Sequence, residues 1–210
     1  MKTPTLFWLY TGFTFHNMMS MAFLVWIPAF LMRAQGISED KAGIMIGIIA
    51  LSAMVGAPLG GWLADFWQKS NKRGRMLVPA LSDFLAAILI IAATLLNLEG
   101  VGFAIAIGYG IIHVCSLPAL QAVTQDVVPP WMKGTSWSLA QFFMYIPLGC
   151  LAPTAVGIIS DAVGGGVYGL KVALIIMSLG GFVGALCFFI SSKHYFSDSE
   201  KVKQHVLEME

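Results

Sequence analysis

The chain has 210 residues, of which 58% are hydrophobic and 11% charged, with a formal net charge of +1. A soluble domain carries about 25% charged residues, so part of the surface must face an apolar medium such as a lipid bilayer. The near-neutral charge gives no electrostatic reason to expect nucleic acid as a partner. The three cysteines lie far apart in apolar runs and have neither metal-site nor disulfide-framework spacing.

Six segments are each long and apolar enough to cross a bilayer, which takes about 20 such residues. In chain order they are residues 5–32, 41–64, 75–97, 100–124, 131–160 and 168–192. Each is expected to be a helix, because unpaired backbone polar groups are not tolerated in hydrocarbon. The sequence therefore predicts an all-α, multi-pass membrane protein with six transmembrane helices and a polar cytoplasmic tail at residues 193–210.

Lysine and arginine are distributed unequally between the two ends of these segments. Three lie on one side, namely Arg33, Lys41 and Lys171. Nine lie on the other, namely Lys2, Lys69, Lys72, Arg73, Arg75, Lys133, Lys193, Lys201 and Lys203. Because positive residues concentrate in cytoplasmic loops, both termini are predicted to be cytoplasmic, in a plasma membrane or a bacterial inner membrane.

A short motif occurs twice along the chain. Residues 61–65 (GWLAD) and 157–161 (GIISD) share the pattern Gly-x-x-small-Asp, and each closes the middle helix of a triplet. Three helices separate the two copies, so they lie on opposite membrane faces, as an inverted repeat requires. The sequence predicts a 3+3 inverted repeat, with units at residues 1–97 and 98–192.

The second segment is rich in glycine. Gly43 with Gly47, and Gly56 with Gly60, form two Gly-x-x-x-Gly pairs. In lipid such pairs let helix backbones approach closely. Two interpretations stay open: packing within this chain, or a surface that slides against a partner bundle.

Several motifs resemble those of the major facilitator superfamily. Residues 60–65 (GGWLAD), with the basic residues 72–75 (KRGR), resemble its signature between the second and third helices of a half. The basic residues come late and Phe66 and Trp67 follow the aspartate directly, which fits the copy in the C-terminal half better. Further stretches that resemble the same superfamily are residues 26–31 (WIPAFL), 128–134 (VPPWMKG) and 152–161. Residues 5–200 resemble helices seven to twelve of spinster-like members.

The resemblance implies half of a major facilitator fold. In each half the first and fourth helices line a central cavity, and the second and fifth face the other half. Polar residues at membrane depth are costly and therefore functional candidates. The predicted substrate cavity comprises His16, Asn17, Ser20, Tyr109, His113, Ser116, Gln121, Gln141 and Tyr145. A histidine there could bind substrate or carry a coupled proton, or be satisfied by a neighbouring helix.

The loop after the second segment is implied to act as a gate. In the family, the loop aspartate and nearby basic residues form a charge clamp that breaks and reforms between states. The predicted clamp residues are Asp65, Lys72, Arg73 and Arg75, and the alternative is an ordinary solvated loop. The four glycines of the second segment would lie at the seam between halves. Asp83, in the third segment, is expected to pair with a basic loop residue or to reach the interface.

These observations predict the C-terminal half of a secondary active transporter. It would move a small organic solute or a lysolipid-like amphiphile by ion-coupled alternating access, as a symporter. Its second six-helix half would be a separate chain, a second copy or a missing N-terminal portion. The alternative is a non-transporting membrane subunit, or a truncated fragment acting as a scaffold or regulator. No catalytic motif of a membrane enzyme is present, no cofactor or metal is expected, and the partners are lipid and a small-molecule substrate.

Overall fold

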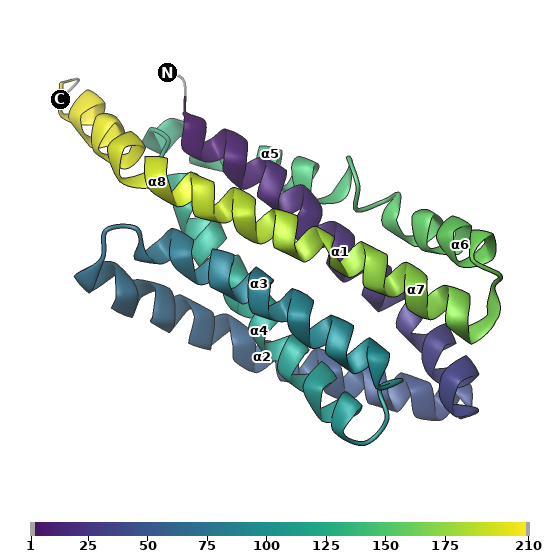
Figure 1. Cartoon of the computed structure of the whole chain (residues 1–210). Helices are drawn as coiled ribbons and strands as arrows, with labels where there is room; N and C mark the ends of the chain where they lie inside the picture. The colour runs from purple at the N-terminus through teal and green to yellow at the C-terminus, as the bar shows by residue number, and fades with distance from the viewer. Residues whose placement is uncertain (1–2, 209–210) are drawn as a thin grey trace.

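The computed structural model describes residues 3–208 as an all-helical protein with no strand in that range. The long helices run back and forth along one common direction (Figure 1). The elements are α1 (Pro4–Gln35), α2 (Glu39–Ser70), α3 (Gly74–Leu95), α4 (Val101–Asp126), η1 (Pro130–Met132), α5 (Lys133–Tyr145), α6 (Ala152–Ala162), α7 (Gly166–Ser178) and α8 (Gly180–Leu207).

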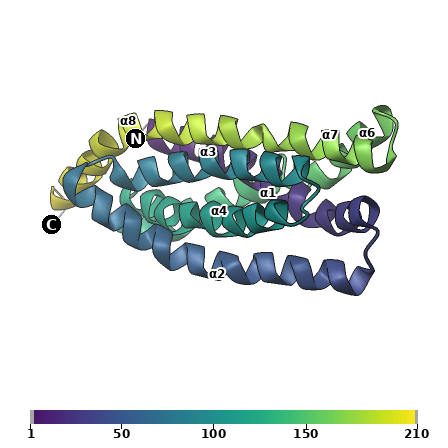
Figure 2. The same cartoon turned by 60° about the horizontal axis from the view of Figure 1, so that its bottom comes forward.

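The helices form two groups that meet mainly where α3 packs against α8 and α7. In Figure 1, α2, α3 and α4 lie together on one side, and α1, α5, α6, α7 and α8 lie on the other. The second view shows α2 at one edge of the bundle and α7 and α8 at the opposite edge (Figure 2). The start of α1, the α2–α3 turn and the end of α8 share one end of the bundle. The passes therefore alternate in direction.

The prediction of six continuous spanning helices is not confirmed. Within residues 3–208, five helical stretches are long and apolar enough to cross a membrane: Pro4–Gln35, Glu39–Ser70, Gly74–Leu95, Val101–Asp126 and Gly166–Leu207. The fifth predicted segment is instead divided into α5, of 13 residues, and α6, of 11 residues. Each is shorter than the roughly 20 residues that a spanning helix needs.

Proline and glycine explain the interruption between α5 and α6. Pro147 lies inside it and lacks the N–H that would bond the preceding turn. Gly149 packs so closely that a Cβ atom there would lie 2.5 Å from the side-chain nitrogen of Asn17. On the other side of the break, the Trp26 indole N–H donates to the carbonyl of Pro153 at 2.8 Å. The break is therefore held against α1 at two points.

The two predicted glycine pairs of α2 lie in different surroundings. A Cβ atom on Gly56 or Gly60 would collide with the backbone carbonyl oxygen of Ile111 or Cys115 on α4. These two glycines therefore pack within the chain, by close backbone contact of the kind that stabilises helix pairs in lipid. Gly43 and Gly47 have no atom within 4 Å of that position, so they remain open to whatever covers α2.

Residues predicted to form a polar tail extend the last helix. The α8 helix continues to Leu207, beyond the last predicted apolar segment. Asp198 accepts hydrogen bonds from the backbone N–H and the hydroxyl of Thr5, at 3.2 and 2.8 Å. The hydroxyl of Ser191 in turn donates to the carbonyl of Thr5 at 2.9 Å. The beginning of α1 is thus fastened to α8.

The turn between α3 and α4 is tight and well satisfied. Asn97 and Leu98 both have positive φ angles, of 54° and 52°. The Gln35 amide donates to the carbonyls of both residues, at 2.8 and 2.9 Å. The Lys171 ammonium donates to the Leu95 carbonyl at 2.8 Å. Side chains from α1 and α7 therefore satisfy carbonyl groups that the end of α3 would otherwise leave unpaired.

Large apolar side chains lie both inside and outside the bundle. Phe13, Phe30 and Phe188 are fully buried. Leu51, Met54 and Trp62 on α2 are 65–71% exposed. An apolar exterior of this kind suits lipid or another apolar helix surface and is unsuited to water. The structure thus agrees with the composition in describing an integral membrane protein.

Candidate functional site

Three ionisable side chains meet in the interior of the bundle. His16 of α1, Asp83 of α3 and His113 of α4 form a group that we call the His–Asp–His cluster. The distance between His16 Nδ1 and Asp83 Oδ1 is 2.8 Å. The His113 ring stacks on the His16 ring, with centroids 4.1 Å apart and planes 12° apart. On its other side His113 stacks with Tyr109 at 5.3 Å.

The cluster is almost completely shielded. Asp83 is 0% exposed, His16 1% and His113 6%. Three of its polar atoms have no hydrogen-bond partner among the described residues, namely His16 Nε2, Asp83 Oδ2 and His113 Nδ1. Buried polar atoms are normally satisfied, and each exception calls for an explanation. Buried ionisable groups inside a membrane protein mark functional sites by default.

One edge of the cluster opens on a groove between α1, α2 and α4. The groove has a volume of about 240 Å³, and we call it the α1–α2–α4 groove. Its polar lining comes from Ser20, Tyr109 and His113. Its apolar lining includes Phe23 and Ile49. A molecule in this groove would meet a mainly apolar wall with a few hydrogen-bonding groups, as small-molecule sites commonly provide.

The structure groups some of the predicted cavity residues and separates others. Ser20, Tyr109 and His113 line the groove, and His16 lies behind His113. Asn17 instead lies beside Gly149 in the break between α5 and α6. Ser116 is buried and bonds the His113 carbonyl of its own helix. Gln121, Gln141 and Tyr145 also lie outside the groove. Gln121 and Tyr145 are exposed, and Gln141 is half-buried.

Asp83 has a different partner from the one expected. It was predicted to pair with a basic loop residue or to reach the interface, but it pairs with His16 inside the bundle. The sequence signal that would have suggested this pair is the similar depth of the two residues along their helices. Asp83 and His16 lie roughly nine and twelve residues from the ends of α3 and α1 at the same end of the bundle, so at 1.5 Å per residue their depths differ little.

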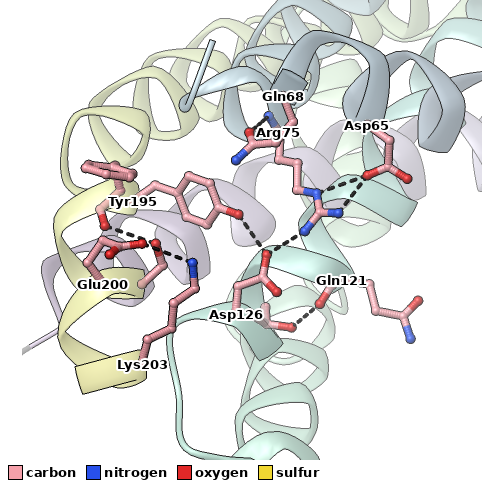
Figure 3. A network of polar contacts seen from close by, with 11 residues as sticks. Asp65, Gln68, Arg75, Gln121, Asp126, Tyr195, Glu200 and Lys203 are labelled. Atoms are coloured by element: carbon pink, nitrogen blue, oxygen red, sulfur yellow. Dashed lines mark hydrogen bonds and ion pairs between the residues drawn. The ribbon is translucent and has the colours of Figure 1, made fainter. Parts of the chain in front are cut away.

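A second polar group lies at the end of the bundle where the α2–α3 turn is found (Figure 3). Arg75 Nη2 and Nε donate to Asp65 Oδ1 at 2.7 and 3.1 Å. Its Nη1 donates to Asp126 Oδ2 at 2.9 Å, and the Tyr195 hydroxyl donates to the same oxygen at 2.7 Å. We call these four residues the Arg75 network. It joins α2, α3, α4 and α8.

The other two predicted clamp residues lie outside this network. The Lys72 ammonium lies 4.1 Å from the centre of the Phe196 ring. The backbone N–H of Arg73 donates to Asn71 Oδ1 within the turn. Sequence reasoning found Asp65 and Arg75 but missed Asp126 and Tyr195. Asp126 was assigned to a connecting loop and Tyr195 to the tail, so neither was considered as a partner.

Comparison with known proteins agrees with this architecture. Residues 1–153 match the family described as the Major Facilitator Superfamily. The chain therefore belongs to the Major Facilitator Superfamily, whose members are transporters and not enzymes.

The probable galactarate/D-glucarate transporter of Escherichia coli (strain K12) is 27% identical over 155 residues, which are 70% of this chain and 33% of that protein. An MFS-type efflux pump of Mycolicibacterium smegmatis is 24% identical over 204 residues, which are 94% of this chain and 47% of the pump. The chain thus spans half or less of the length of these relatives.

A solved structure shows the same fold. A bacterial homolog of the human lysosomal transporter Spinster, in an inward-facing and occupied conformation, superposes with a TM-score of 0.76 at 20% identity. The match covers 94% of this chain and 50% of that chain. At this identity the likeness establishes the fold and leaves the substrate open.

Proposed function

We propose that this chain is the C-terminal half of a secondary active transporter that moves a small organic solute by alternating access. The observation that carries the proposal is the α1–α2–α4 groove, where Tyr109 and His113 form polar positions in an otherwise apolar wall. Membership of the superfamily and the 33–47% coverage of its relatives support it. Three-plus-three helix repeats place such sites near the midplane between two halves.

The chemistry of the groove favours an amphiphilic solute. Phe23, Ile27 and Ile49 offer apolar contact, while Ser20, Tyr109 and His113 offer hydrogen bonds. No lysine or arginine of the described residues lines it, so they supply no fixed positive charge to this wall. An amphiphile with a hydrogen-bonding head and an apolar body, such as a lysolipid, fits this wall. A sugar acid, suggested by the galactarate/D-glucarate relative, would take its positive partner from the other half.

The exposed side of α2 supports a second six-helix bundle as the partner. Ile44, Ile48 and Leu51 are 41–66% exposed there, and Gly43 and Gly47 leave room for close helix approach. The partner would be a separate chain, a second copy or the preceding portion of a longer protein. The bias of lysine and arginine supports cytoplasmic termini, which would put the Arg75 network on the cytoplasmic side of a plasma membrane or a bacterial inner membrane.

The Arg75 network is proposed to act as the gate. Asp65 and Asp126 bind different nitrogens of one guanidinium, so either contact can be released while the other persists. Asp65 is 64% exposed and Asp126 33%, so the Asp65 contact is the one freer to break. Asp65→Asn would remove the negative charge from this contact and weaken it, and uptake should slow as the populations of inward-open and outward-open states shift. Unchanged uptake and unchanged state-specific cysteine labelling would contradict the gate.

The groove is tested by solute flux in liposomes that contain the chain together with its second half. A panel of sugar acids and lysophospholipids identifies the transported class. Tyr109→Phe and Ser20→Ala should then lower uptake at limiting solute, because each removes a hydrogen-bonding group from the groove. Tyr168→Phe is the matched control, since Tyr168 is 69% exposed and lies outside the groove. A folded assembly without flux for any solute would favour a scaffold or regulatory subunit instead.

A further inference from the structure

We propose that the His–Asp–His cluster is a proton-binding site that holds one exchangeable proton and receives it from the α1–α2–α4 groove through His113. The proposal concerns Asp83 on α3, a helix that lines neither the groove nor the exposed side of α2. Its role in driving uptake rests on the proposed transport function, but proton binding itself does not.

The ring geometry argues against a metal ion as the occupant. His16, Asp83 and His113 offer ligand atoms within 4.8 Å of one another, which is close enough to suggest a metal site. A metal binds an imidazole nitrogen in the ring plane, at about 2.0–2.1 Å for zinc. The two imidazole rings are stacked with their centroids 4.1 Å apart and their planes inclined by 12°, so the planes do not intersect near the rings. One ion cannot lie in both planes, and a proton needs only one.

Charge balance limits the site to one added proton. With Asp83 ionised, a proton on His16 makes a neutral pair, joined by the 2.8 Å hydrogen bond. A second proton on His113 would place two positive rings 4.1 Å apart with a single carboxylate to compensate them. A buried charge is expensive unless it is paired. The state with one added proton is therefore neutral, and release of that proton leaves a charge of −1 on the cluster.

The surroundings supply no competing charge. The neighbouring polar residues are Asn17 and Ser20 on α1 and Tyr109 on α4, and none of these residue types is charged at neutral pH. The α8 helix contributes Gly184 and Phe188, neither of which titrates. A Cβ atom on Gly184 would lie 3.0 Å from Asp83 Oδ2, so this carboxylate oxygen faces backbone. In the described part of the chain, His16 is the ion-pair partner of Asp83.

The unpartnered atoms give the proton a route. His113 lines the groove, its ring lies against that of His16, and His16 bonds Asp83. His113 Nδ1 and His16 Nε2 are both unpartnered, so each can accept or release a proton without breaking another bond. A proton arriving from the groove would reach His113 first. It would then bind His16, because Asp83 supplies the counter-charge there.

The first experiment measures protonation without transport. Nitrogen-15 resonances of the histidine rings are followed in the purified chain, in lipid nanodiscs, between about pH 5 and 8, the range in which histidine changes charge. His16 should change state in a single step, with His113 remaining neutral. Asp83→Asn should abolish the His16 step, because the buried imidazolium would lose its counter-charge. Asp161→Asn, at an exposed carboxylate, should leave the step in place.

Three results would overturn the proposal. The first is His16 with an unchanged step in Asp83→Asn. The second is His16 and His113 both charged at the low end of the range. The third is no change at either ring across it. Because Asp83→Asn could fail to fold, His113→Gln gives an independent variant that keeps the His16–Asp83 pair. It should preserve the equilibrium step but slow the exchange of the His16 proton with solvent.

A transport arm separates failure of this inference from failure of the proposed function. In liposomes with both halves, an imposed pH gradient should drive solute accumulation, and Asp83→Asn should remove that response while Asp161→Asn keeps it. Equal responses in Asp83→Asn and wild type would overturn the role of the cluster but leave transport intact. Absence of flux in wild type would refute the proposed function and leave the histidine titration to decide proton binding.

Discussion

Arg75 combines three contacts that no other basic residue could combine. Its guanidinium donates to Asp65 through two nitrogens and to Asp126 through a third. A planar fork of fixed donors makes this possible, whereas a lysine ammonium is a compact point charge on a flexible chain. The identity of the side chain, and not merely its charge, should therefore matter at this position.

Arg75→Lys should weaken the joint between α2 and α4. A lysine can hold one aspartate at a time, and a partly exposed ion pair contributes about 0.2–1 kcal/mol. We expect a lower thermal midpoint in detergent and slower uptake by the assembled transporter. Arg73→Lys is the control, because the side chain of Arg73 forms no ion pair in the described residues. Equal behaviour of the two variants would show that charge alone suffices at residue 75.

Tyr195 links the extended part of α8 to the same network. Its hydroxyl donates to Asp126 Oδ2 at 2.7 Å. Among the described residues, Arg75 is the other side chain that donates to this oxygen. Tyr195→Phe should lower the free energy of unfolding by roughly 1 kcal/mol, the usual contribution of one hydrogen bond. Denaturation monitored by circular dichroism measures it. Tyr168→Phe, which alters an exposed hydroxyl, should have no effect, and an equal loss there would contradict the assignment.

At the residue scale, the sequence identified all three members of the His–Asp–His cluster but only two of the four residues of the Arg75 network. His16 and His113 stood out because ionisable residues are rare at membrane depth. Asp83 stood out too, but its partner depends on how α1, α3 and α4 are arranged, which a single sequence does not reveal. Asp65 and Arg75 came from a resemblance, whereas Asp126 and Tyr195 entered the network through tertiary packing.

At the element scale, the pairing of α2 with α4 depends on small residues. Gly56→Ala should be destabilising, because its Cβ would collide with the Ile111 carbonyl oxygen, which belongs to backbone and cannot rotate away. Overpacking of this kind costs about 1–3 kcal/mol. In the isolated chain Gly43→Ala should be harmless, since nothing lies within 4 Å of the new atom. Thermal unfolding of both variants tests this, and the midpoint should be lower for Gly56→Ala than for Gly43→Ala. Equal midpoints would contradict the packing described.

The same glycine pair gives a distinct expectation for assembly. If α2 meets the second half through Gly43 and Gly47, then Gly43→Leu should reduce co-purification of the two halves without lowering the thermal midpoint of the isolated chain. Retained co-purification would show that the two halves contact each other at another surface. This result would separate packing inside the bundle from packing between bundles, two interpretations that the sequence alone left open.

The broken fifth segment shows why element counts fail. Residues 131–160 are continuous in hydropathy, and hydropathy was the quantity used to define spans. Pro147 and Pro153 were visible in the sequence, but prolines are tolerated in membrane helices when neighbours satisfy the freed groups. Whether they bend or interrupt a helix depends on what packs beside them, here Asn17 at Gly149 and Trp26 at Pro153.

At the scale of the whole molecule, composition was sufficient to predict the structural class of the protein. A chain with 11% charged residues and long apolar runs has few alternatives to an all-α membrane protein. The alternation of basic and non-basic turns anticipated the alternating passes of Figure 1. The division into residues 1–97 and 98–192 stays a prediction, because it rests on a short motif pair and on no contact between helices.

We propose that this chain supplies one wall of a two-walled transporter. The direct measurement is solute flux into liposomes containing the chain alone, the second half alone, or both at increasing ratio. We expect background flux from a monomer of the chain, and flux that rises with added partner until the two halves are equal in number. Full flux from a dimer of the chain would identify a second copy as the partner, whereas full flux from the monomer alone, insensitive to any partner, would contradict the proposal.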